Sequence, residues 1–197
     1  TLERILELER TTNLHYVVGN HDYLMWWLST RDLHYHALEV RKSIWLKDDG
    51  ISFFFIHGYE LEVLASLWPL SIEDYERIAH RLCFQTDKIG KTMSLLWGWW
   101  KRLFGKRGGA ASVVKIAQPP EDRAKDLNRV DELVEAGMAH LIYGLKEGER
   151  LVFGHTHRPK RFSSDMAGNP GSWVEDSPGH NKYLVISGGQ MRLEEFK

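Results

Sequence analysis

The sequence predicts an α/β fold, and three observations support this expectation. Short apolar segments of strand length alternate with longer segments in which apolar residues recur at helical spacing. Three of the apolar segments end in a polar cluster that contains histidine and is flanked by glycine. The chain has 197 residues, of which 43% are hydrophobic and 27% are charged, so one domain with a core of ordinary size is expected, with room for an insertion.

The first part of the chain is expected to contain one helix and three strands. Apolar residues among Glu and Arg predict an amphipathic helix that starts near Leu2 and ends near Arg10. Strands are predicted over Leu14–Val18, Ser43–Leu46 and Ile51–Ile56. The sequence Lys47-Asp48-Asp49-Gly50 between the last two predicts a turn.

The segment from Tyr59 to Tyr143 differs in kind and is predicted to be a mostly helical insertion or cap. Ser71 is the expected N-cap of a helix whose apolar residues recur over Ile72–Leu82. A second helix is predicted around Leu127–Val134, after two consecutive prolines.

Strand character returns in the last part of the chain. Leu151–Phe153 is a predicted strand, and the segments Tyr183–Ile186 and Gln190–Phe196, joined by two glycines, predict a closing hairpin. The expected division is residues 1–58 for the first part of the core, 59–144 for the insertion, and 145–197 for the last part of the core.

Charge and cysteine content argue against several classes of protein. The chain has 26 basic and 27 acidic residues, and this balance gives no general reason to expect nucleic-acid binding. A single cysteine, Cys83, rules out an internal disulfide and fits a reducing compartment. The charged segment Thr1–Arg10 does not look like a signal peptide, and no apolar run reaches the roughly 20 residues that span a bilayer. The sequence therefore predicts a cytoplasmic protein.

The polar clusters at the three strand ends form the candidate site. Ligands of α/β proteins gather where strands end, and the neighbouring glycines allow the backbone to turn sharply there. Neutral imidazole and carbonyl oxygen suit zinc, manganese or iron. Any single histidine could be an ordinary loop residue, but three clusters together favour a shared metal. The candidate residues are Asn20, His21, Asp22, His57, His155 and His157.

Three motifs in these clusters resemble a known signature. Gly19-Asn20-His21-Asp22, His57-Gly58 and Gly154-His155-Thr156-His157 look like the third, fourth and fifth blocks of the calcineurin-like metallophosphoesterases, in order. Arg158-Pro159 and Asn169-Pro170-Gly171-Ser172-Trp173 are also similar to sequences in that family. The resemblance covers roughly residues 1–58 and 145–197, and it implies the family's α/β/β/α sandwich of two sheets flanked by helices.

The resemblance implies an enzyme that hydrolyses a phosphate ester or pyrophosphate bond with two divalent metal ions, manganese, zinc or iron. Asn20, His57 and His155 would bind one ion, and His157 would bind the other. His21 would lie beside the substrate phosphate and help to protonate the leaving group, while Asp22 would orient His21. The ions would clamp the phosphoryl oxygens and activate water.

Two further blocks of the family signature, an Asp-x-His and a Gly-Asp-x-x-Asp, should precede Gly19, but the residues before it include no aspartate. Those blocks supply the carboxylate that bridges the ions and further ligands of the second ion. The chain is therefore expected to be an N-terminally truncated member of the family. Asp32-Leu33-His34 is an Asp-x-His that follows the third block. Its expected role is a solvated loop or helix face, and a permuted metal site is the alternative. An inactive scaffold on the same fold is the alternative function.

A segment rich in tryptophan and basic residues, Trp97–Arg107, lies within the expected insertion. Tryptophan favours boundaries between apolar and wet regions, and basic residues attract anionic headgroups. The segment predicts a cap that contacts a lipid or a membrane surface, which would make the enzyme peripheral to a membrane. This architecture resembles the UDP-diacylglucosamine pyrophosphatases of the same superfamily, whose substrate is a lipid-linked pyrophosphate. In the alternative interpretation, the tryptophans pack inside an ordinary cap helix.

Overall fold

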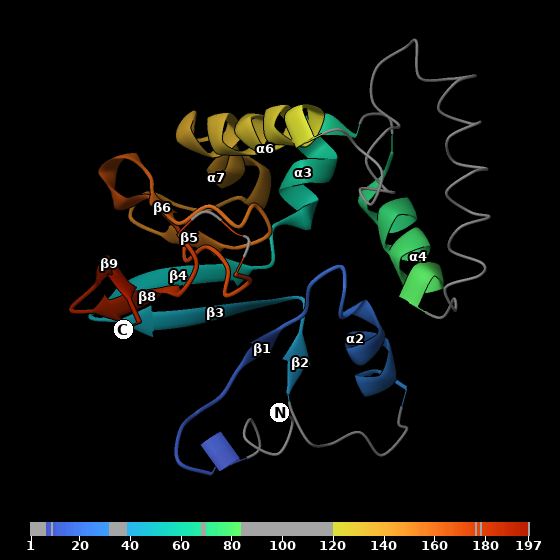
Figure 1. Cartoon of the computed structure of the whole chain (residues 1–197). Coiled ribbons are helices and arrows are strands. Elements are labelled where there is room, and N and C mark those ends of the chain that lie inside the picture. The colour runs from blue at the N-terminus through green and yellow to red at the C-terminus, as the bar shows by residue number, and fades with distance from the viewer. Residues whose placement is uncertain are drawn as a thin grey trace.

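The centre of the molecule is a five-stranded mixed sheet (Figure 1). In this computed structural model the described residues are 7–8, 10–31, 39–67, 70–83, 120–175, 177 and 179–196. The strands are, in sheet order, β3 (Ser43–Asp48), β4 (Ile51–Ile56), β5 (Arg150–Phe153), β7 (Ala167–Asn169) and β6 (Lys160–Arg161). The three inner strands run parallel, and each edge strand runs antiparallel to its neighbour. The predicted α/β class is confirmed.

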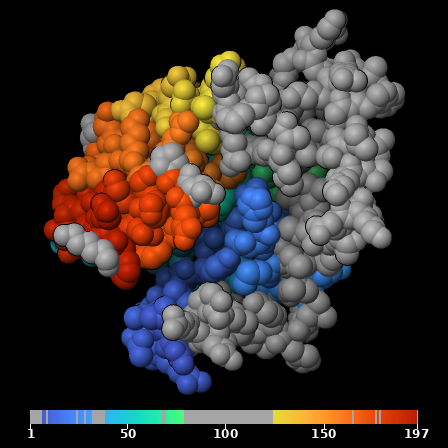
Figure 2. Space-filling model, viewed as in Figure 1, coloured from blue at the N-terminus to red at the C-terminus, as the bar shows by residue number. Residues whose placement is uncertain are grey.

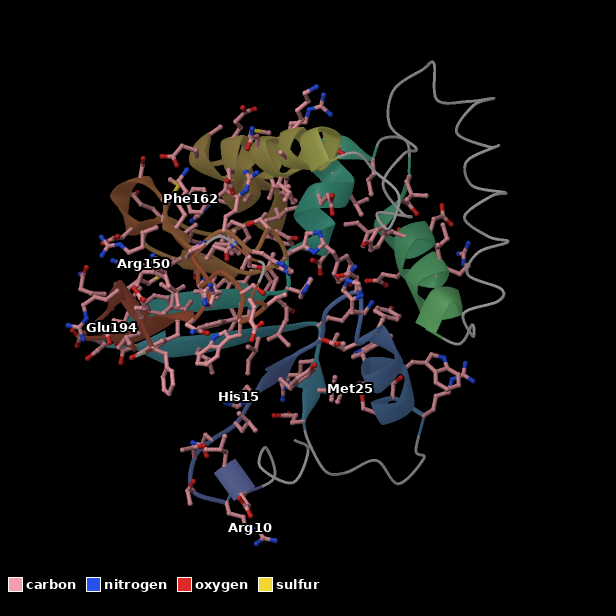
Figure 3. All side chains as sticks on the ribbon, in the orientation of Figure 1. Arg10, His15, Met25, Arg150, Phe162 and Glu194 are labelled. Atoms are coloured by element: carbon pink, nitrogen blue, oxygen red, sulfur yellow. The ribbon has the colours of Figure 1, made fainter. Side chains whose placement is uncertain are left out.

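One face of this sheet is covered by helices. Successive side chains of a strand point to opposite faces, and Phe54, Ile56, Leu151 and Phe153 share one apolar cluster. The cluster is completed from α3 (Tyr59–Ser66), α6 (Pro120–Glu135) and α7 (Met138–Tyr143). Phe162, labelled in Figure 3, belongs to the same cluster and is 3% exposed. This layer is the main hydrophobic core.

The opposite face is covered by the hairpin of β8 (Lys182–Ser187) and β9 (Gln190–Glu195). Phe53 and Val152 of the sheet pack there against Met191, with Leu184 and Ile186 beside them. Gly188 and Gly189 both have positive φ angles, 59° and 67°, as the tight turn of a two-residue hairpin requires. The predicted closing hairpin is therefore confirmed, and it ends at Glu195 rather than Phe196.

The first strand departs from the prediction in length and in partner. β1 spans only Tyr16–Val17 and pairs in parallel with β2 (Val40–Arg41), outside the five-stranded sheet. The ladder begins with a hydrogen bond from the Tyr16 N–H to the Glu39 carbonyl, so Leu14 and His15 lie before it. A helix that the sequence did not indicate, α2 (Tyr23–Ser29), follows β1 and contacts α4 (Ile72–Cys83).

The helices at both ends of the expected insertion lie on the sheet. α3 follows β4 directly, α6 and α7 lead into β5, and all three contribute to the main core. The predicted N-cap of α4 is confirmed, because Ser71 Oγ accepts a hydrogen bond from the Asp74 N–H at 3.0 Å. The helix predicted around Leu127–Val134 is the longer α6. The division at residues 59 and 144 stays a prediction.

Three predictions fall wholly or mostly on residues outside the described ranges. They concern the basic and aromatic segment Trp97–Arg107, the Asp32-Leu33-His34 sequence, and most of the helix that ends near Arg10, of which Glu7 and Leu8 are described as helical. Within the described ranges, no helix combines the length and the apolar character needed to cross a membrane. Figure 2 shows the described N-terminal part (blue) meeting the C-terminal part (orange) on one face of the molecule.

Candidate metal centre

The parallel pairing of β4 and β5 places two histidine clusters at one edge of the sheet. Ile56 and Phe153 are paired in register, and the chain leaves these strands at His57 and Gly154. The Gly154 N–H donates a hydrogen bond to the His57 carbonyl at 2.8 Å. The rings of His57 and His155 consequently lie close, with centroids 5.1 Å apart and planes at 66°.

This separation of the two rings fits a shared cation. Imidazole binds zinc at about 2.0–2.1 Å, and two imidazoles at a tetrahedral angle then have ring centroids about 5 Å apart. The observed distance of 5.1 Å between the His57 and His155 centroids agrees with that arrangement.

Gly19 brings the third cluster to the same place. A Cβ atom built on this buried glycine would lie 2.6 Å from both Cδ2 and Nε2 of His57, so the backbone after β1 lies directly against that ring. Next in the chain, Asn20 has a buried Oδ1 atom that accepts no hydrogen bond from the described residues. A buried amide oxygen without a donor costs about 1–3 kcal/mol, and a bound cation would remove that cost. The residues present therefore fit a metal ion held by Asn20, His57 and His155.

A buried carboxylate that the sequence did not reveal contacts this group. Glu62 on α3 has a fully buried side chain, and its Oε2 atom hydrogen-bonds with Nε2 of His155. α3 starts at the residue after Gly58, whose φ of 106° strongly favours glycine. This turn brings α3 back over the strand end that carries His155. In the sequence Glu62 resembles any acidic residue of a helix.

The loop that carries His155 and His157 is held by Asn169, a fully buried residue at the end of β7. Its Nδ2 group donates to the carbonyl of Gly154 and to Oγ1 of Thr156, both at 2.9 Å. The loop needs this support because both histidines have left-handed backbone angles, φ 65° and 59°. Asn169 was noted in the family resemblance, but no role was predicted for it.

The other three predicted site residues, His21, Asp22 and His157, are described by their exposure and their hydrogen-bond partners. The His21 side chain is exposed, and Asp22 Oδ2 accepts a hydrogen bond from the Tyr16 hydroxyl at 2.9 Å. His157 Nδ1 lies 3.4 Å from Ser177 Oγ. The roles of these residues at the phosphate and at a second ion stay predictions.

The proposed ligands of the first ion are not a cluster of the usual metal-binding residue types alone. Among the described residues, no three His, Cys, Asp or Glu side chains converge closely enough to hold a metal ion. The third predicted ligand of the first ion is the amide of Asn20, which is not one of those types.

A second carboxylate of α3, Glu60, binds the backbone beside the site. Its Oε2 atom accepts a hydrogen bond from the Gly58 N–H at 3.2 Å. Burial raises the pKa of Glu60 to about 7, against the opposing effect of the backbone hydrogen bonds. The Glu60 carboxyl group therefore binds its proton more tightly in the folded protein than in the unfolded chain. The protonated carboxyl stabilises the fold fully below about pH 4.5, the ordinary pKa of glutamate, and this contribution is lost as the pH rises through about 7.

We expect Glu60→Gln to remove this pH-dependent loss of stability. Glutamine keeps an oxygen acceptor for the Gly58 N–H and carries no charge. The variant should match wild type at pH 5 and be more stable at pH 8, by about 1–3 kcal/mol. Thermal unfolding between pH 5 and pH 8 measures this, with the exposed Glu73 of α4, changed to Gln, as control. Parallel pH profiles for Glu60→Gln and wild type would contradict the expectation.

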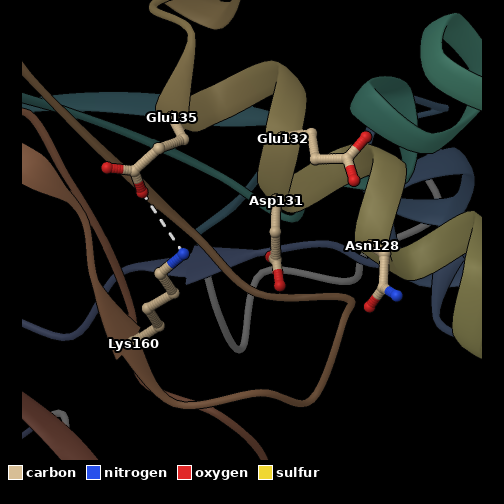
Figure 4. A pocket seen from close by; sticks show the side chains of 5 residues that line it. All are labelled: Asn128, Asp131, Glu132, Glu135 and Lys160. Atoms are coloured by element: carbon tan, nitrogen blue, oxygen red, sulfur yellow. Dashed lines mark ion pairs between the residues drawn. The ribbon is translucent and has the colours of Figure 1, made fainter.

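An acidic hollow of about 260 Å³ lies elsewhere, along α6. It is lined by Asn128, Asp131, Glu132, Glu135 and Lys160 (Figure 4). Lys160 Nζ is 3.2 Å from Glu135 Oε2, and Arg158 Nη1 is 3.6 Å from Asp131 Oδ2. Because two of its three carboxylates already have cationic partners, this hollow is a poorer candidate for a metal than the histidine site.

No family model matches this sequence, and no curated protein matches it. The assignment of the site therefore depends on the residues at the ends of β1, β4 and β5 and on the distances between them.

Proposed function

We propose that the chain carries part of the active site of a calcineurin-like metallophosphoesterase, a hydrolase of phosphate ester or pyrophosphate bonds that uses two divalent cations. One observation carries this proposal: the rings of His57 and His155, from two strand ends, lie with centroids 5.1 Å apart, and Gly19, the neighbour of Asn20 at a third strand end, lies against the His57 ring. The α/β/β/α sandwich of that family is part of the proposal. The order of helix layer, five-stranded sheet and hairpin supports it.

Each residue has a role in this proposal that suits its surroundings. The Asn20 oxygen and the imidazoles of His57 and His155 hold the first cation, and His157 holds the second. The cations supply Lewis-acid activation of the phosphoryl group and of the attacking water. His21 follows Asn20 directly and is exposed, so it can meet the substrate phosphate from the solvent side and hold the proton that the leaving group needs.

The proposal is tested by hydrolysis of p-nitrophenyl phosphate and its diester by the full-length protein that contains these residues. We expect turnover that requires Mn²⁺ or Zn²⁺ and stops on chelation. His21→Ala should lower kcat by about 10²–10⁴-fold, because general acid catalysis contributes this much. Bound metal in that variant, measured by elemental analysis, should stay within about twofold of wild type because His21 is assigned to the phosphate.

The control is His180→Ala, which removes an exposed histidine near the C-terminus. A full-length protein that binds no divalent cation would overturn the whole proposal. Metal binding without hydrolysis would favour the alternative, an inactive scaffold on the same fold. A His21→Ala protein that loses metal but keeps its activity per bound ion would show that His21 is a ligand instead.

A further inference from the structure

We infer that Glu62 is a positioning residue for the metal centre, which fixes the proton of His155 on Nε2 and so directs the Nδ1 lone pair to the cation. The inference rests on the proposed function. Its basis is the hydrogen bond between Glu62 Oε2 and His155 Nε2, whose side chains are 0% and 7% exposed. No part of the family resemblance points to Glu62.

The position of Glu62 requires an explanation that packing alone does not provide. Its neighbours on α3, Leu61 and Val63, are also buried and are apolar. A carboxylate taken out of water is costly unless a hydrogen-bonding partner compensates for it, and an apolar side chain would fill the same space without that cost. A carboxylate here therefore indicates that its interaction with His155 matters.

The chemistry of imidazole connects this interaction to metal binding. A neutral ring has one N–H group and one nitrogen with a lone pair, and a metal needs the lone pair. When Nε2 donates to a carboxylate, Nδ1 is the atom that presents the lone pair, and its basicity rises. The hydrogen bond also fixes the ring plane, which for His155 stands at 66° to the ring of His57.

The fold couples the two histidines through this contact. His57 follows β4, the chain turns at Gly58, and α3 then carries Glu62 back to the histidine that follows β5. The Gly58 backbone also lies beside His155, since a Cβ there would be 3.4 Å from Cβ of His155. The short segment from His57 to Glu62 therefore contains one proposed ligand, His57, and orients another, His155, through the Glu62 carboxylate.

Two substitutions separate hydrogen bonding from packing. Glu62→Gln keeps an acceptor for the Nε2 proton and loses the charge, whereas Glu62→Met keeps the volume and has no strong acceptor. The first measurement is long-range ¹H–¹⁵N NMR of His155 in the metal-free protein at pH 8. Wild type and Glu62→Gln should carry the proton on Nε2, and Glu62→Met should show a mixture of tautomers.

The second measurement is calorimetric titration of the full-length protein with Mn²⁺ or Zn²⁺. Loss of such a partner lowers metal affinity by about 10–100-fold, so we expect about tenfold for Glu62→Gln and about 100-fold for Glu62→Met. Glu60→Gln is the matched control, because it removes a buried carboxylate of the same helix whose partner is the Gly58 backbone. Its affinity should stay within about twofold of wild type.

The outcomes distinguish this inference from the proposed function. A wild-type His155 with its proton on Nδ1, or a Glu62→Met protein with wild-type affinity, overturns the inference and leaves the function standing. A wild-type ring protonated on Nε2 in a protein that binds no cation overturns the function instead. If Glu62→Met does not fold, Glu62→Gln decides: a loss of affinity with the tautomer retained supports the inference, and unchanged affinity overturns it.

Discussion

Gly19→Ala is expected to lower the affinity of the proposed metal site by about 100-fold, which is the scale of losing the orientation of a ligand. The added Cβ atom would lie 2.6 Å from Cδ2 and Nε2 of His57, closer than carbon atoms can approach, so the ring must move. Metal–ligand distances tolerate changes of about 0.2 Å, and the required displacement exceeds that. Gly19 is not among the glycines with positive φ, so the effect comes from space and not from backbone strain.

The matched control is Gly154→Ala, a methyl group added near the backbone of the same histidine. Its Cβ would lie 3.5 Å from the His57 carbonyl, an ordinary contact, and affinity should stay within about threefold of wild type. His57→Ala gives the scale of complete ligand loss. Calorimetry with Mn²⁺ on the full-length protein compares the three variants. Wild-type affinity in Gly19→Ala would show that the ring of His57 does not lie against residue 19, and wild-type affinity in His57→Ala would show that His57 is not a ligand.

Glu76→Ala is expected to destabilise the fold by about 3–5 kcal/mol. This is the range for removing one partner of a buried ion pair while the other partner remains. Glu76 on α4 accepts hydrogen bonds from the hydroxyls of Tyr23 and Tyr59, at 2.8 and 2.6 Å, and from Lys42 Nζ at 2.6 Å. Its side chain is only 13% exposed. Alanine would leave one ammonium group and two phenols without this acceptor. Denaturant unfolding measures the loss. Arg77→Ala, at the next and exposed position, should change stability by about 0.5 kcal/mol or less.

Acid provides an independent test of the Glu76 network. Burial raises the pKa of Glu76, but the hydrogen bonds from Lys42, Tyr59 and Tyr23 outweigh burial and hold the pKa below its ordinary value of 4.5. The carboxylate is therefore more acidic in the folded state, so its contribution is present above about pH 4.5 and is lost as the pH falls further. Glu76→Gln should unfold with a flatter acid profile than wild type, and Glu73→Gln should not. Equal profiles for Glu76→Gln and wild type would contradict the network.

The strands that carry the site were predictable because they are continuous apolar runs. Ile51–Ile56 and Leu151–Phe153 are buried between a helix layer and a hairpin, and such strands need no alternation of polar residues. Each strand is followed by a glycine next to a histidine, so the sequence alone predicted that both histidine clusters lie at strand ends. Their meeting at one edge of the sheet additionally required that β4 and β5 be parallel neighbours, which the sequence alone did not establish.

The elements that were missed depend on distant partners. β2 has two residues, too short to show any periodicity, and only its pairing with β1, which was predicted as the longer strand Leu14–Val18, makes it a strand. Glu62 and His155 are 93 positions apart, and Tyr23 and Glu76 are 53 apart. Acidic residues on helices are usually solvated, so their spacing in the sequence could not distinguish these buried carboxylates from surface ones.

The contacts that place His57 and His155 come from both sides of the chain between α4 and α6. β4 pairs with β5, and α3, which follows β4, packs against α6, which precedes β5. Changes of sequence between α4 and α6 would leave these contacts in place. In evolution, the candidate site could therefore stay constant while the sequence of that interval of the gene diverges.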